Sequence, residues 1–294
     1  MTFYGDCPIP QQWPPYNGVA CTPMPTAIVR LQTTEGFVIA ADGRVRGNQN
    51  GKLEVVTDEL QKIYQIEGEF LVYALYGTMG IGKDENDPDV AVNLVSAFKN
   101  AVDALHGQHF EDAVQYGNAL ALPIYNRIRD AKANAKIERF PERDCDAEPD
   151  QPGHVIGHVF LFGYYNGKAC ELDIRLFHRK QSLAQPTVTQ RRLWLGYDPE
   201  IWGSDTVARL LYTSSENVFF PAYRRRKPKR QEDLTISEAI EVAKNYILAC
   251  DSVTGRALDP DFCPGIGGHI HIAVITPNSF RWAVGYEPGG QTEL

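Results

Sequence analysis

Apolar and polar residues form blocks that predict paired strands in the first third of the chain. Two apolar runs, residues 27–31 and 36–41, flank the polar residues 32–35. Residues 60–66 and 70–76 repeat this arrangement around a short Glu-Gly-Glu turn. Apolar runs of this length on either side of a polar turn are typical of β-hairpins. Because the two hairpins follow one another, we expect a four-stranded antiparallel meander.

Two longer stretches have the periodicity of helices. Residues 90–105 place six apolar side chains along one side, and residues 111–136 are rich in Ala, Leu and Ile. Pro123 lacks the backbone N–H that a helix interior needs, so we expect it to kink or divide the second helix.

The second half of the chain carries turn and capping signals. Asn166-Gly167 is a strong hairpin signal, and Thr235 with Glu238 forms the pattern of a helix capping box. The pattern predicts strands at residues 158–162, 169–177 and 192–195, helices at 204–212 and 235–250, and a closing hairpin of 270–275 and 280–284.

This order of strands, helices, strands, helices and strands indicates an α+β fold, with two antiparallel sheets packed face to face and helices outside. A doubly wound parallel sheet would alternate strand and helix along the chain. Residues 1–25 contain six prolines and read as an N-terminal extension or propeptide. We expect one domain over residues 26–287 and a short tail at 288–294.

Composition removes several functional classes. The chain has 294 residues and a net charge of −8, so it has no summed positive field to attract nucleic acid or an anionic membrane. No window approaches the roughly 18 consecutive apolar residues of a membrane-spanning helix, and the N-terminus lacks a signal-peptide pattern. Six scattered cysteines favour reduced thiols. We therefore expect a soluble, cytoplasmic protein.

A glycine-rich stretch at residues 77–84 nearly matches a phosphate-binding loop. The final position of that motif needs a hydroxyl that binds Mg²⁺, whereas this chain has Asp84. A carboxylate there would repel phosphates, so we expect a strand-to-helix turn and no nucleotide cofactor.

Histidines give a second candidate, a metal site. His269 and His271 are two residues apart and share one face of a strand, with Cys263 upstream and with His154 and His158 on another strand. These ligands lack the compact spacing of a zinc site. We expect no metal.

Four positions form a third candidate site. Thr26 opens the first strand, Asp42 ends the second, Lys62 lies near the start of the third and Gly77 ends the fourth. In antiparallel neighbours, the start of one strand lies beside the end of the next. The first three side chains can therefore meet at one end of the sheet.

These residue types suit nucleophilic catalysis. A Thr hydroxyl needs a nearby base, and a free α-amino group at Thr26 would supply one at neutral pH. Lys62 would provide a positive field, and Asp42 would keep that lysine charged and oriented. The Gly77 N–H would donate to a developing oxyanion.

Residues 26–81 resemble a β-type subunit of the proteasome, particularly the simpler bacterial peptidase of this N-terminal-nucleophile (Ntn) hydrolase family. Thr26 is followed sixteen residues later by Ala-Ala-Asp-Gly-Arg around Asp42, then by Gln-Lys-Ile around Lys62 and by a strand that ends at Gly77. The resemblance implies a four-layer αββα sandwich. It also implies threonine-type peptidase or amidase activity on peptide or protein substrates, after removal of residues 1–25.

The chain departs from the family pattern at several positions. Pro25 stands where the family has Gly. After Leu195-Gly196 the family has Ser, whereas this chain has Tyr197. Cys263 and Ile266 align with the family's accessory Asp and Ser, and Asp259 or Asp261 are candidates for the missing acid. The alternative to an enzyme is a noncatalytic structural or ring-assembly subunit of proteasome-like type.

Two charged segments bear on assembly. Residues 142–150 are acidic and residues 224–230 are basic, so one could contact the other head to tail between copies of the chain. A contact of this kind repeats and can close a ring. The resemblance and this charge pattern lead us to expect a homo-oligomer.

Overall fold

A computed structural model provides the structure of the chain. It describes residues 26–49, 52–77, 80–83, 90–140, 154–193, 196–212, 219–223 and 229–288. The expected N-terminal extension, the acidic segment 142–150, most of the basic segment and residues 289–294 lie outside these ranges, as do Cys7, Cys21 and Cys145.

One large antiparallel sheet contains both ends of the described chain. Its strands lie in the order β13-β1-β2-β14-β15. Their bounds are β1 Ile28–Gln32, β2 Phe37–Asp42, β13 Glu200–Trp202, β14 Ile270–Thr276 and β15 Ser279–Trp282.

A second large sheet has the order β11-β10-β9-β6-β5, with β12 paired to β10. Its bounds are β5 Ile63–Ile66, β6 Phe70–Gly77, β9 His154–Tyr165, β10 Lys168–Arg179, β11 Ser182–Leu183 and β12 Thr187–Gln190. Two further two-stranded sheets pair β3 with β4 and β7 with β8. These strands are β3 Val45–Gln49, β4 Lys52–Thr57, β7 Gly80–Gly82 and β8 Val90–Asn93.

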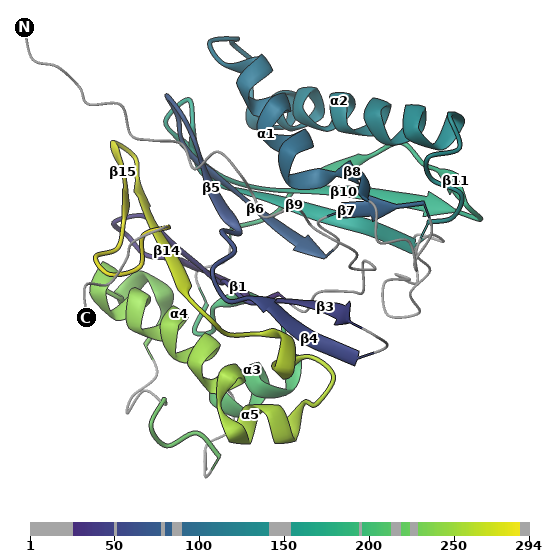
Figure 1. Ribbon diagram of the computed structural model, residues 1–294. Coiled ribbons are helices and arrows are strands. Elements are labelled where there is room, and N and C mark those ends of the chain that lie inside the picture. The colour runs from purple at the N-terminus through teal and green to yellow at the C-terminus, as the bar shows by residue number, and fades with distance from the viewer. Residues whose placement is uncertain are drawn as a thin grey trace, which may run out of the picture.

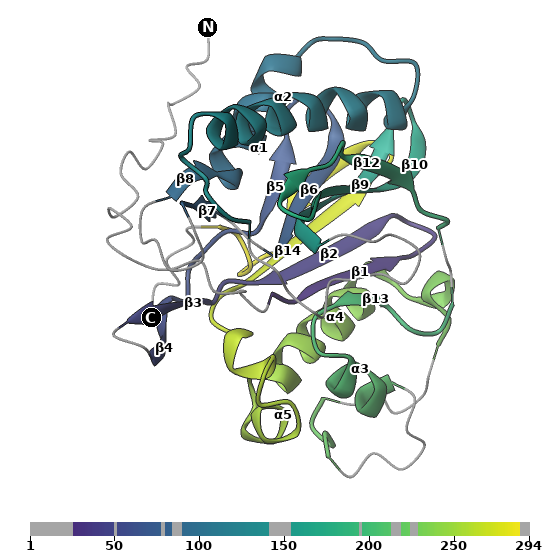
Figure 2. The same ribbon diagram turned by 90° about the vertical axis from the view of Figure 1, so that its right-hand side faces the viewer.

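Five α-helices accompany these sheets in the described ranges. They are α1 Leu94–Leu105, α2 Ala113–Ala133, α3 Asp205–Tyr212, α4 Ile236–Asp251 and α5 Val253–Leu258, with 3-10 turns at Gln231–Asp233 and Cys263–Gly265. Figures 1 and 2 show α1 and α2 on one side of the molecule and α3, α4 and α5 on the other.

Apolar side chains fill three clusters. One lies between the second sheet and helices α1 and α2, and includes Phe98 and Leu172. Another joins the first sheet to α3 and α4, and includes Val29 and Tyr246. The third lies between the two large sheets and includes Phe160. In β1, β2 and β6, alternate residues face different clusters, as the two-residue period of a strand requires.

The expected four-layer αββα sandwich is wrong for this chain. Strand exceeds helix, at 36% against 31%, and the strands form several antiparallel sheets. The β3–β4 and β7–β8 pairs are separate from both large sheets. Periodicity indicates which segments are strands, but it does not say which strands pair, so it could not reveal these additional sheets.

The expected four-stranded meander is also wrong. Hairpin β1–β2 belongs to one large sheet and hairpin β5–β6 to the other, and β2 pairs with β14 on the edge that a meander would give to β5. The β3–β4 hairpin lies between them in the chain. Because both hairpins are apolar on each face, either sheet assignment satisfies the pattern.

Three boundaries differ from expectation for local reasons. The first helix begins at Leu94, because residues 90–93 pair with β7 and Asn93 caps the helix through its side chain. Pro123 lies inside the single helix α2, on its exposed side, so α2 is not divided. Strands β12 and β13 lie on either side of the strand expected at residues 192–195, of which residues 192 and 193 are outside any strand and residues 194 and 195 lie outside the described ranges.

Two local signals are confirmed. Asn166 and Gly167 have φ values of 49° and 73° and connect β9 to β10, as the Asn-Gly turn predicts. The capping box at Thr235 and Glu238 opens α4, since the side chain of each residue bonds the backbone N–H of the other.

A buried ion pair joins the two large sheets. Arg30 of β1 lies 2.6 Å from Glu171 of β10, and each side chain is 1% exposed. Burial raises the pKa of Glu171, whereas Arg30 opposes this shift. A shift of one sheet against the other would separate these two buried charges, which is energetically costly. The pair therefore holds the facing sheets in one relative position.

Replacing Arg30 alone is expected to be strongly destabilising. Arg30→Met leaves the Glu171 carboxylate buried without its main cation, and we expect the free energy of unfolding to fall by about 3–5 kcal/mol. The double change Arg30→Met with Glu171→Leu should recover much of this loss, because no buried charge remains. Urea denaturation measures both effects.

The control is Asp103→Ala, which breaks an exposed pair with Lys99. We expect it to cost about 0–1 kcal/mol. An Arg30→Met loss no larger than that of the control would contradict a structural role for the buried pair.

Candidate functional site

Asp42 is the centre of the candidate site. It ends β2, and its side chain is fully buried. Oδ1 accepts the Ala27 N–H at 2.8 Å and the Lys62 ammonium at 2.9 Å. Oδ2 accepts the backbone N–H groups of Arg44 and Gly267, each at 3.2 Å. One carboxylate therefore connects three separate segments of the chain.

Lys62 reaches Asp42 from the second sheet. It lies immediately before β5, it is fully buried, and its Nζ also donates to the Arg44 carbonyl at 2.9 Å. Burial lowers the pKa of Lys62, while the Asp42 carboxylate opposes the shift. Burial likewise raises the pKa of Asp42, against the ammonium and two backbone N–H groups. The charge of each group therefore depends on the presence of the other.

Thr26 precedes the residue that Asp42 holds. It is fully buried, and the Ala27 N–H that bonds to Asp42 belongs to the peptide formed with the Thr26 carbonyl. The structure thus brings Thr26, Asp42 and Lys62 to one end of the molecule's two large sheets.

Gly77 ends β6 at the corresponding end of the second sheet. The Leu75 N–H donates to the Lys62 carbonyl at 3.2 Å. Gly77 lies two residues further along β6 than this contact with Lys62. Gly77 has a φ of 91° and pairs with Gly157 of β9. A residue with a side chain would be strained in that conformation.

A serine missed in the sequence analysis lies beside Thr26. A Cβ on Gly203 would stand 3.5 Å from the Thr26 carbonyl oxygen, so the Gly203 backbone approaches Thr26 closely. The next residue, Ser204, is fully buried and donates from Oγ to Asp259 Oδ2 at 2.6 Å. Its Oγ also accepts the Val207 N–H at 3.2 Å, at the start of α3.

The setting of Ser204 differs from that of Tyr197, the residue that follows Leu195-Gly196 in the sequence. Tyr197 is 63% exposed, whereas Ser204 is buried and bonds the half-buried Asp259. Asp259 is one of the two acids proposed from the sequence. A Gly-Ser pair directly before an amphipathic helix was the available signal, because serine is a preferred N-cap residue.

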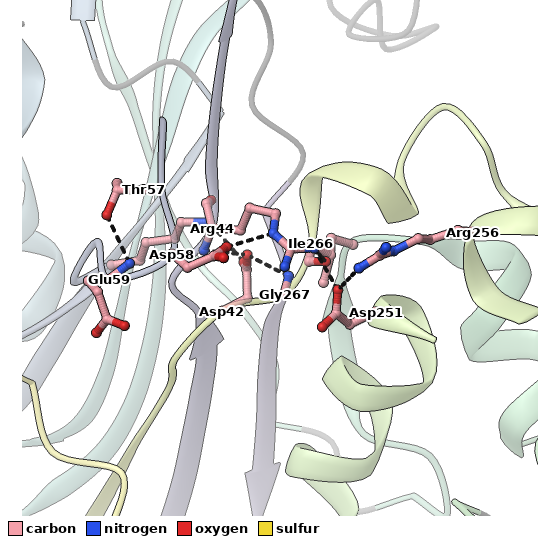
Figure 3. Close-up of polar contacts among 10 residues, drawn as sticks. Asp42, Arg44, Thr57, Asp58, Glu59, Asp251, Arg256, Ile266 and Gly267 are labelled. Carbon is pink, nitrogen blue, oxygen red and sulfur yellow. Dashed lines mark hydrogen bonds and ion pairs between the residues drawn. The ribbon is translucent and has the colours of Figure 1, made fainter. Parts of the chain in front are cut away.

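Arg44 ties the site to its surroundings, as Figure 3 shows. Its Nε donates to Asp58 at 2.7 Å, after β4. Its Nη1 donates to Asp251 at 2.6 Å, at the end of α4, and to the Ile266 carbonyl at 3.1 Å. Since Gly267 in turn donates to Asp42, this guanidinium positions the loop that completes the Asp42 contacts.

His271 is a buried histidine near the same pair. It is 1% exposed, its Nδ1 has no hydrogen-bond partner among the described residues, and its ring contacts that of His269. Burial lowers the pKa of His271 to about 4, with smaller effects from His269 and from Lys62. The neutral imidazole is therefore the form that fits beside the ammonium.

The two other candidates from the sequence are described in part, since residues 78, 79 and 84 of the glycine-rich stretch lie outside the described ranges. Gly80–Gly82 is strand β7, followed along the described chain by strand β8 rather than by a helix. Within the described ranges, no three His, Cys, Asp or Glu side chains are grouped so that they could hold a metal ion. His154 stacks on His178, and His158 contacts Asp173 at 3.1 Å.

Comparison with known proteins gives no relative. No protein-family model matches the chain, and no curated protein sequence matches it. Among the described helices, none is both long enough and apolar enough to cross a membrane.

Replacing the guanidinium group of Arg44 tests its role in positioning the loop that contains Ile266 and Gly267. Arg44→Lys keeps the charge but cannot reach Asp58, Asp251 and the Ile266 carbonyl together. We expect a loss of about 1–3 kcal/mol in the free energy of unfolding, measured by urea denaturation. Arg256→Lys, which alters an exposed contact to the same Asp251, is the control and should cost less than about 1 kcal/mol. Equal losses would contradict the role given to Arg44.

Acid should destabilise the fold through His271. The unfolded imidazole binds a proton near pH 6.5, whereas the folded one resists protonation until about pH 4. This contribution to stability is complete above about pH 6.5 and is lost as the pH falls towards 4, by about 3 kcal/mol in total. Urea denaturation across this range should show a shallower slope for His271→Gln. The same slope in the variant, or a shallower slope in the exposed control His106→Gln, would contradict this assignment.

Proposed function

We propose that the protein is a threonine-dependent peptidase or amidase in which Thr26 acts as an N-terminal nucleophile. One observation carries the proposal: the buried Asp42 carboxylate holds both the Ala27 N–H next to Thr26 and the Lys62 ammonium. The resemblance of residues 26–81 to proteasome β-type subunits supports the same assignment. Peptide or protein amides are the proposed substrates.

In the proposed reaction, removal of residues 1–25 frees the α-amino group of Thr26. This amine takes the proton of the Thr26 hydroxyl while Oγ attacks the substrate carbonyl. The Gly77 N–H stabilises the oxyanion, and the Lys62 ammonium favours the negative charge that develops on Oγ. The amine then passes its proton to the leaving nitrogen, and water hydrolyses the ester that remains.

Two sets of contacts near Thr26 support this scheme. Ser204 follows Gly203, whose backbone approaches the Thr26 carbonyl, and the Ser204 hydroxyl donates to the half-buried Asp259. Asp42 accepts hydrogen bonds at both oxygens and keeps the Lys62 ammonium in a fixed direction.

A second function, a noncatalytic structural subunit, is favoured by one observation. Thr26 is fully buried in the intact chain, and the Asp42–Lys62 pair is satisfied by contacts within the protein. A polar network of this kind can have a purely structural role, in which it connects segments of the chain. The two functions differ in whether residues 1–25 are removed.

Self-association is part of the proposal, with the acidic and basic segments as contacts. Two residues of the basic segment already pair within the chain, Lys229 with Glu238 at 2.5 Å and Arg230 with Glu232 at 2.7 Å. Residues 224–228 and 142–150 lie outside the described ranges, and the contact between copies is proposed for them from their charge alone. Exposed pairs contribute only about 0–1 kcal/mol each, so they would set register rather than affinity.

Substitution at Thr26 tests the enzyme directly. Thr26→Ala should abolish amide hydrolysis, because the nucleophile is lost, while Thr26→Ser should retain measurable activity. Intact mass should show loss of residues 1–25 from the active wild-type protein, and an electrophile that needs both a hydroxyl and a free amine should label Thr26. Circular dichroism controls for folding.

Hydrolysis by purified Thr26→Ala would move the nucleophile elsewhere. A full-length wild-type chain with no hydrolysis and no labelling would favour the structural subunit instead.

A further inference from the structure

A large cavity lies on the described surface between the edges of the two large sheets. Its volume is about 880 Å³, within the range of ligand sites. Its walls come from the β5–β6 hairpin, from the end of α1 and from residues 282–288. We call it the acidic groove. None of the four residues proposed for catalysis lines it.

The groove has a strong negative character. Glu67, Glu69, Asp103 and Glu287 line it, whereas its lysine, Lys99, is already paired with Asp103 at 3.0 Å. Helix α1 ends at the groove without a basic residue in its last turn. The negative end of the helix dipole therefore adds to the carboxylates.

Aromatic rings form part of the same walls. Tyr64 and Tyr73 stack with their centroids 4.9 Å apart, and Tyr116 and Trp282 also line the groove. Burial raises the pKa of Tyr73, and Asp103 raises it further. Tyr73 therefore stays neutral at physiological pH, and the faces of aromatic rings attract cations.

The groove runs along a strand edge. Strand β5 is the outermost strand of its sheet and pairs with β6 alone among the described strands. Gln65, in the middle of this edge, is exposed and lines the groove. Gln61 caps the Ile63 carbonyl at 2.7 Å, so the chain itself covers part of the edge. An edge strand of this kind accepts an added extended segment.

We propose that the acidic groove binds an extended peptide segment that carries arginine or lysine side chains. The cationic side chain lies among Glu67, Glu69 and the Tyr64 ring, and the peptide backbone follows the β5 edge at Gln65. The carboxylates and rings select the charge, and the strand edge selects a peptide over a small cation. This site is independent of the proposed hydrolase function.

Calorimetric titration of the full chain tests the proposal. The probe is an acetylated, amidated hexapeptide of alternating arginine and leucine, and its control has citrulline in place of arginine, which keeps the shape without the charge. We expect the arginine peptide to bind at least about tenfold more tightly than the citrulline peptide and than arginine amide alone.

Variants locate the site. Glu67→Gln with Glu69→Gln should weaken binding about tenfold, and Gln65→Arg, at an exposed position, should weaken it by repulsion. The control Glu54→Gln with Glu138→Gln removes the same charge from exposed positions elsewhere and should change affinity less than about twofold. Thermal melting verifies that each variant folds.

Three results would overturn the proposal. They are absence of binding by the arginine peptide, equal binding by the citrulline peptide or by arginine amide, and unchanged affinity in Gln65→Arg. Equal weakening in the groove variant and the control variant would show attraction to the net charge of the protein rather than to this groove.

Discussion

The central contacts of the candidate site depend on the pairing of Asp42 with Lys62. Two oppositely charged groups are fully buried at 2.9 Å, and each would be costly inside the protein without the other. Because Asp42 ends a strand of one sheet and Lys62 precedes a strand of the other, the pair also fixes how the sheets meet. Chemistry and architecture therefore share one constraint.

The Arg30–Glu171 pair acts on the same interface at another place. Hydrophobic packing between the sheets, as at Phe160 and Ile39, favours contact but allows the sheets to slide. Ion pairs with fixed geometry penalise such sliding, since any shift leaves a buried charge unpaired. Two polar contacts thus select one arrangement from many that apolar residues alone would accept.

Local structure followed from the sequence more fully than long-range pairing. The Asn166-Gly167 turn and the Thr235 cap depend on adjacent residues, so their signals are visible in a few letters. The pairing of β2 with β14 joins residues more than 200 positions apart, and no local pattern encodes it. The four-layer sandwich was wrong for this reason.

The residues of the candidate site also differ in whether the sequence could identify them. Thr26, Asp42 and Lys62 could be grouped because each stands at the end of a hairpin strand. Ser204 could not be linked to Asp259 by spacing, since 55 residues separate them. Arg44 is the last residue of the Ala-Ala-Asp-Gly-Arg stretch and His271 was considered only for a metal site. Their places here depend on distant segments, since Arg44 bonds Asp251 and Lys62 acts on His271.

The hydrogen bonds to Asp42 bear on the order of folding and of cleavage between residues 25 and 26. Their donors belong to Ala27, Arg44, Lys62 and Gly267, all on the C-terminal side of the bond between residues 25 and 26. These contacts exist while that bond is intact, and none of them is broken by its hydrolysis. If the chain is an enzyme precursor, its maturation is a matter of cutting one bond in a finished framework, with no refolding required at Asp42.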